Sequence, residues 1–67
     1  MYHFSRSERH EAIFERMREN GETVTMMYLY RSEISKFLKQ HFFVVPKSVH
    51  PTRPHMFLCE VTLPKEE

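Results

Sequence analysis

The chain has 67 residues, of which 40% are hydrophobic, and it carries a formal net charge of +1 at neutral pH. A chain of this length builds one domain (1–67) around a small core and is too short to enclose a substrate pocket. We therefore do not expect this protein to be an enzyme. No apolar run is long enough to cross a membrane, and the single cysteine excludes an internal disulfide. We therefore expect a cytoplasmic protein that forms a homodimer to support its small core.

Positive charge is concentrated in the middle of the sequence. Residues 1–22 hold four Arg and five Glu, whereas residues 31–53 hold five Lys or Arg and one Glu. A basic block of this kind is typical of surfaces that meet nucleic acid, although a solvated face without a partner has the same composition.

The first predicted element is a helix between Ser5 and Gly21. Ser5 and Glu8 have the spacing of a capping box, and Gly21 can take the left-handed conformation that ends a helix. One helical stripe carries apolar or partly apolar side chains (His10, Ile13, Phe14, Met17). The remaining positions are mostly Arg and Glu, which indicates a solvated face.

Residues 22–30 favour a β-strand. Thr, Val and Tyr are common in strands, and the apolar run from Met26 to Tyr30 suits a strand that is buried on both faces. A short helix beginning at Thr25 is the alternative, because Met and Leu are good helix formers.

A second helix is predicted from Ser32, which can act as its N-cap. Its apolar stripe comprises Ile34, Phe37, Leu38, His41 and Phe42. The polar side contains only one acid, Glu33, close to the helix start, where a negative charge favours the helix dipole.

Two β-prone runs, 42–45 and 56–63, flank a basic loop with three prolines, 46–55. Proline cannot continue a central ladder, so we expect the strands to lie outside this loop. Alternate residues of the last run are all apolar and should face the core (Phe57, Cys59, Val61, Leu63). Pro64 should end the last strand, which leaves 64–67 as a frayed tail.

These elements predict an α+β fold in the order α-β-α-β-β, with two helices packed on a small, mainly antiparallel three-stranded sheet. The order has the outline of a winged helix, in which a helix enters the major groove of DNA and the tip of a hairpin touches the DNA phosphates or the minor groove. The stretch between Gly21 and the hairpin is short for the two helices and the turn of a helix-turn-helix.

The leading functional hypothesis is a small nucleic-acid-binding regulator that uses the second helix and the basic loop. Lys and Arg would neutralise phosphates, and Ser and Gln would meet base edges. The candidate residues are Arg31, Ser32, Ser35, Lys36, Lys39, Gln40, Lys47, His50 and Arg53.

The alternative function is a protein-binding adaptor or inhibitor that docks on a larger partner through an aromatic and Met-rich face. Tyr28 and Tyr30 are its candidate residues, and Tyr2 and Phe4 add to an aromatic content larger than one small core needs. If Tyr28 and Tyr30 belong to an edge strand, that strand could pair with a second copy or with a partner's sheet.

The spacing of His50, His55 and Cys59 invites a comparison with zinc ligands, which are Cys and His side chains held in fixed geometry. Two of the three lie in the loop, and Cys59 falls in the register that faces the core. We therefore expect no metal, no cofactor and no catalytic residues, and we interpret the histidines as unrelated surface side chains.

Overall fold

The computed structural model describes residues 8–65, and within them it has two helices and one antiparallel sheet of three strands. The elements in chain order are α1 (Glu8–Glu19), β1 (Val24–Tyr30), α2 (Arg31–Lys39), β2 (Phe43–Val49) and β3 (Met56–Thr62). The predicted α+β class and element order are confirmed. The predicted N-cap Ser5 and the aromatic residues Tyr2 and Phe4 lie outside the described residues, as do 66–67 of the predicted tail.

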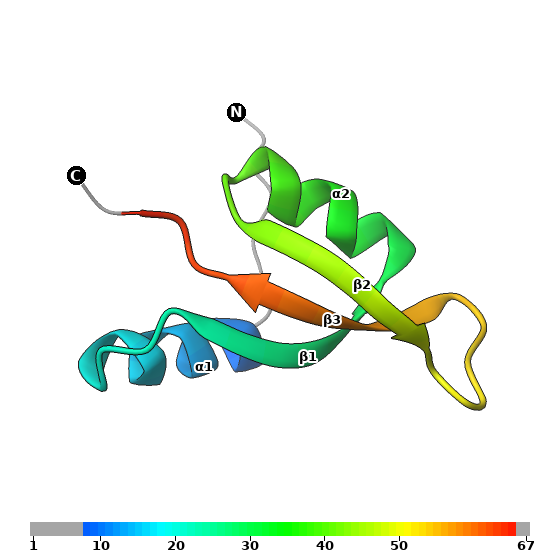
Figure 1. Ribbon diagram of the computed structural model, residues 1–67, viewed down its shortest axis with the longest axis horizontal. Helices are drawn as coiled ribbons and strands as arrows, with labels where there is room; N and C mark the ends of the chain where they lie inside the picture. The colour runs from blue at the N-terminus through cyan, green and yellow to red at the C-terminus, as the bar shows by residue number, and fades with distance from the viewer. Residues whose placement is uncertain (1–7, 66–67) are drawn as a thin grey trace.

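The last strand of the chain occupies the centre of the sheet, because the strand order is β1-β3-β2 (Figure 1). Both β1 and β2 pair antiparallel with β3, with Met27 opposite Cys59 on one side and Val44 opposite Val61 on the other. The predicted strand over residues 24–30 is therefore correct, and the alternative helix is not formed.

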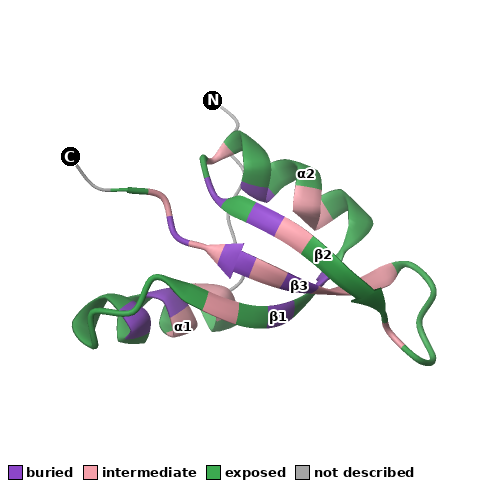
Figure 2. Cartoon of the chain, viewed as in Figure 1, coloured by how far each residue is buried: buried purple, intermediate pink, exposed green. Residues whose placement is uncertain are grey.

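Both helices cover the same face of the sheet. Phe14 of α1 and Phe37 of α2 are fully buried, and their ring centroids lie 6.0 Å apart. Phe42 completes this cluster, with centroids 5.0 Å from Phe14 and 4.9 Å from Phe37. Beneath the rings lie the inward side chains of the sheet, which include Leu29, Val44, Cys59 and Val61. Figure 2 shows these buried positions in purple, and most of the loop after β2 in green.

The two helices end in the same hydrogen-bonded motif. Glu22 N–H donates to the Met17 carbonyl oxygen after Gly21, and Phe42 N–H donates to the Phe37 carbonyl oxygen after His41. Gly21 and His41 both have a left-handed backbone, with φ of 73° and 72°. This is the Schellman motif, whose usual apolar contact is here made by the rings of Phe37 and Phe42. The motif therefore turns Phe42 into the core.

Several local expectations about the second helix are wrong, and the first of them fails because β1 runs into α2 without a loop. Tyr30 is the N-cap, and its N–H donates to Glu33 Oε1 at 2.9 Å, so Ser32 lies inside the helix rather than at its cap. The helix ends at Lys39, which leaves His41 beyond it. Leu38 is 49% exposed and does not belong to the buried stripe.

The expected boundary of the second strand is also wrong. Pro46 lies within β2, which continues to Val49, and the loop is reduced to residues 50–55. An edge strand tolerates proline because the missing N–H can face outward, and the register shifts at this point between Pro46 and Ser48. The winged-helix likeness is not confirmed: between β1 and β2 the structure has one helix, whereas a helix-turn-helix needs two.

Candidate protein-docking site

None of the elements within the described residues covers the face of the sheet that lies away from the helices. Along β1 buried and exposed residues alternate: Met27 and Leu29 are buried, whereas Met26 and Tyr28 are exposed. The expectation that this strand is buried on both faces is therefore wrong, because both helices pack on one side. We call the uncovered side the open face. Its side chains are Val24, Met26, Tyr28 and Tyr30 of β1, Phe43, Val45, Lys47 and Ser48 of β2, and Met56, Leu58, Glu60 and Thr62 of β3.

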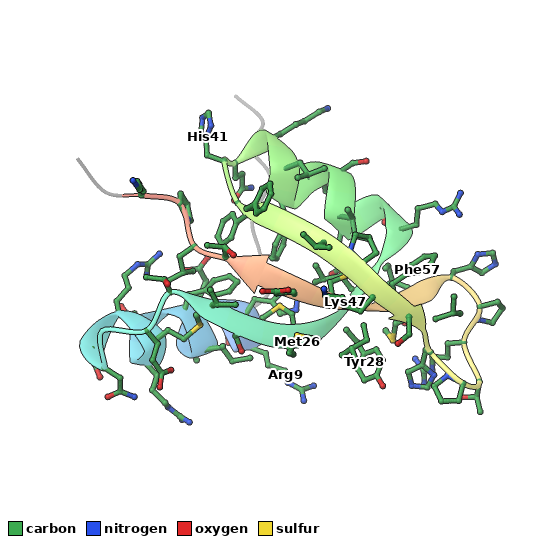
Figure 3. The ribbon with its side chains drawn as sticks, viewed as in Figure 1. Arg9, Met26, Tyr28, His41, Lys47 and Phe57 are labelled. Atoms are coloured by element: carbon green, nitrogen blue, oxygen red, sulfur yellow. The ribbon has the colours of Figure 1, made fainter. Side chains whose placement is uncertain are left out.

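Apolar side chains dominate the open face. The register aligns Met26 with Glu60 and Val45, and Tyr28 with Leu58 and Ser48, in rows across the three strands. At one end Phe43 is 67% exposed, although it is a large aromatic residue. Figure 3 shows Met26 and Tyr28 along β1, with Lys47 across the sheet from them. An exposed sheet face rich in apolar side chains is typical of an interaction site.

The charged groups near the centre of the open face compensate one another. Lys47 Nζ lies 3.4 Å from Glu60 Oε1, and both side chains are well solvated. An exposed pair of this kind contributes at most about 1 kcal/mol to stability. Its main consequence is that Lys47 adds little net charge to this face.

The loop between β2 and β3 folds against the end of β1. The rings of Tyr28 and His50 meet at 4.7 Å between centroids, and Arg53 Nη1 donates to Tyr30 Oη at 3.2 Å. Thr52 N–H donates to His50 Nδ1, and the Arg31 N–H donates to the His55 carbonyl oxygen. Tyr28, Tyr30, His50 and Arg53 thus form one cluster, which joins candidates from both sequence-based hypotheses.

The nine predicted nucleic-acid-binding residues do not form one surface. Arg31, Ser32, Ser35, Lys36 and Lys39 are exposed on α2, and Gln40 is half-buried at its end. Lys47, His50 and Arg53 are associated with the open face through Glu60, Tyr28 and Tyr30. The two groups are therefore on opposite sides of the sheet. The Arg31 guanidinium lies 5.8 Å from the centre of the Phe57 ring, which is a cation–π contact.

Cys59 has none of the properties of a nucleophile or an exposed metal ligand. Its side chain is fully buried, and its Sγ donates to the Phe57 carbonyl oxygen at 3.4 Å. Burial raises the pKa of this thiol above its ordinary value of 9.0, so the neutral form is favoured. In the described part of the chain, no three His, Cys, Asp or Glu side chains are close enough together to hold a metal ion.

Sequence reasoning missed the exposure of Met26 and Phe43, which are the most informative residues of the open face. The available signal was the two-residue alternation of 24–30, but both alternate sets are mostly apolar, so the pattern does not reveal which set is covered.

Comparison of the chain with protein-family models, with curated proteins and with solved structures finds no match. None of the helices within residues 8–65 has the length and apolar character that a membrane crossing requires.

Proposed function

We propose that this protein is a small, non-catalytic binding module that docks on a larger protein through the open face. The observation that carries the proposal is the exposure of Phe43 and Met26 on a sheet face dominated by apolar side chains. Fully burying a side chain of this size contributes about 1.5–3 kcal/mol of favourable free energy, which is not gained while the side chain stays in water. Tyr, Phe and Met are also the residue types that protein interfaces favour.

The charges around the open face support a particular kind of partner. The loop 50–55 carries Arg53 and two histidines without an acid, and Arg31 lies beside it at the start of α2. At the centre the Lys47–Glu60 pair contributes little net charge. We infer that the complementary surface is an apolar patch on a protein, with acidic side chains on the side that meets Arg53 and the loop 50–55. A cytoplasmic location is part of this proposal, supported by the lone buried thiol.

The test places a photo-crosslinking amino acid at one of two exposed apolar positions. Position 43 lies on the open face and is 67% exposed, whereas position 38 lies on α2 and is 49% exposed. Both variants are irradiated in cells of the source organism. We expect a protein adduct from position 43 that untagged wild-type chain competes away, and no matching adduct from position 38. Equal adducts from both positions, or none from position 43, would refute the proposal.

Nucleic-acid binding is a second candidate, which the cluster around the loop supports. The rings of Tyr28 and His50 meet edge to face, and Arg53 is bonded to the neighbouring Tyr30. Single-stranded nucleic acids are bound by such combinations of aromatic and cationic side chains.

A titration of labelled protein with random-sequence DNA and RNA tests this second candidate. It predicts amide shifts at His50 and Arg53 that disappear as salt rises, because phosphate binding releases counterions. The double variant Lys36→Glu, Lys39→Glu separates the α2 surface from the loop surface. If low-salt titrations leave all amides unmoved, nucleic-acid binding is excluded.

A further inference from the structure

The two edges of the sheet differ in how well they are protected from pairing with another strand. The edge of β2 contains Pro46, the register shift that follows it, and Lys47. Proline, irregular register and lysine are the features that block edge-to-edge association. β1 has none of them: its seven residues, VTMMYLY, are uncharged and pair with β3 in an uninterrupted register.

The hydrogen bonds at both ends of β1 identify which backbone groups point outward. The Leu63 N–H donates to the Thr23 carbonyl oxygen at 2.8 Å, and the Arg31 N–H donates to the His55 carbonyl oxygen at 3.1 Å. In an antiparallel ladder the residues bonded to one neighbour alternate with residues that face the other side. The odd-numbered residues of β1 therefore face β3, and Val24, Met26, Tyr28 and Tyr30 direct their backbone groups to the outer edge.

Glu33 limits the length of this outer edge. Its carboxylate accepts the Tyr30 N–H, so that donor is already used as part of the helix cap. The outward N–H groups without a backbone partner among the described residues are those of Val24, Met26 and Tyr28. This set is symmetric about Met26.

We propose that a second copy of this chain pairs with β1, antiparallel and centred on Met26, to form a continuous six-stranded sheet. In this register Met26 faces Met26 of the second copy, and Val24 faces Tyr28. The three residues on each side exchange both bonds with their partners, which gives about six hydrogen bonds and uses every outward donor. A register shifted toward α2, in which Val24 faces Tyr30, would need the Tyr30 N–H, which Glu33 occupies. A register shifted the other way would set Tyr28 opposite residue 22, which lies outside β1.

The surroundings of the edge leave room for such a strand. A groove of 650 Å³ extends beside β1, with Arg9, His10 and Ile13 of α1 on its far side and Met26, Met27 and Tyr28 on the near side. Figure 3 shows the Arg9 side chain beyond the edge of β1. Because β1 is uncharged, self-pairing brings no like charges opposite one another. The open face is left uncovered and doubled in width, so the inference is independent of the docking function proposed above.

The first test compares Met26→Pro with Met26→Ala in the purified full chain by sedimentation equilibrium. Proline removes the outward N–H at the centre of the proposed pairing, and an edge position tolerates it within the monomer. Alanine removes the same side chain but keeps the N–H. We expect wild type and Met26→Ala to approach twice the 8.2 kDa monomer mass as concentration rises. For Met26→Pro we expect a dissociation constant at least ~10-fold higher.

Amide hydrogen exchange in the wild-type chain keeps the proposal falsifiable if Met26→Pro does not fold. We expect Val24, Met26 and Tyr28 amides to exchange more slowly at high than at low protein concentration. The Tyr30 amide, which Glu33 already holds, should change little. A monomer at all accessible concentrations, a dimer insensitive to Met26→Pro, or fast exchange at these three amides in a dimer would overturn it. Phe43→Lys should leave dimerisation intact, which separates this result from the docking test.

Discussion

Phe42 and Phe43 are adjacent phenylalanines that the structure places on opposite sides of the chain, and replacing each with alanine tests that placement. Phe42 is 4% exposed within the ring cluster, whereas Phe43 is 67% exposed on the open face. The two substitutions remove the same atoms from neighbouring positions. Any difference between them therefore reports the environment of the side chain.

The expected difference is large relative to the stability of the protein. Truncating a buried Phe to Ala costs about 3–5 kcal/mol, and the two ring contacts at 5.0 and 4.9 Å place Phe42 within this range. A chain of this length is stable by roughly 3–10 kcal/mol. Phe42→Ala should thus remove a third or more of the stability, whereas Phe43→Ala should stay within about 0.5 kcal/mol of wild type.

Urea unfolding followed by far-UV circular dichroism measures both effects at a protein concentration where the chain is monomeric. Phe42→Ala should lower the midpoint by about 2 M or more, or unfold the chain outright. In the latter case Phe42→Leu, with a cost of about 1–2 kcal/mol, gives a measurable value. Equal losses for the two alanine variants, or a larger loss for Phe43→Ala, would refute the assigned register of β2 and with it the open face.

Three further predictions concern single positions. Gly21→Ala should lower the free energy of unfolding by about 1 kcal/mol and His41→Gly should raise it by about 0.5 kcal/mol, because both positions have a left-handed backbone; effects of the same sign in urea unfolding would contradict this. Burial raises the pKa of Cys59, so its contribution to stability is present below the ordinary pKa of 9.0 and is lost as pH rises through the folded-state pKa. Cys59→Val should therefore lose less stability than wild type between about pH 8 and pH 10, and identical pH profiles would disprove the assignment. Glu33→Ala should cost about 0.5–1.5 kcal/mol, since it removes the acceptor for the Tyr30 N–H, and unchanged thermal unfolding would show that this cap is not formed.

Much of the fold could be predicted because local and periodic signals agree. Gly21 ends α1 as expected, and the alternation of Phe57, Cys59 and Val61 identified the core face of β3. The errors arose at junctions. Sequence patterns gave no indication that Tyr30 would be both the last residue of a strand and the N-cap of a helix. They also led us to place Pro46 outside the strands. Proline is excluded only from central strands, and the sequence does not reveal that β2 lies at the edge of the sheet.

The site was less predictable than the fold. Tyr28 and Tyr30 were identified from their type, but Met26 was assigned to a strand buried on both faces, and Phe43 to a β-prone run without an assigned face. Which face of a strand is covered depends on where the helices pack, which is a tertiary property that one strand's sequence does not encode. The contact between Arg53 and Tyr30 likewise joins residues that are far apart in the sequence, and the sequence carried no signal for it.

The most direct test of the docking function is the affinity of the partner protein captured at position 43 for three purified chains: wild type, Phe43→Lys and Leu38→Lys. Both variants exchange an exposed apolar side chain for the same charge, on the open face and on α2 respectively. We predict that Phe43→Lys raises the dissociation constant by at least ~10-fold, since a buried apolar contact is replaced by a desolvated charge. Leu38→Lys should leave it unchanged. Equal affinities for all three chains, or a loss confined to Leu38→Lys, would contradict a docking role for the open face.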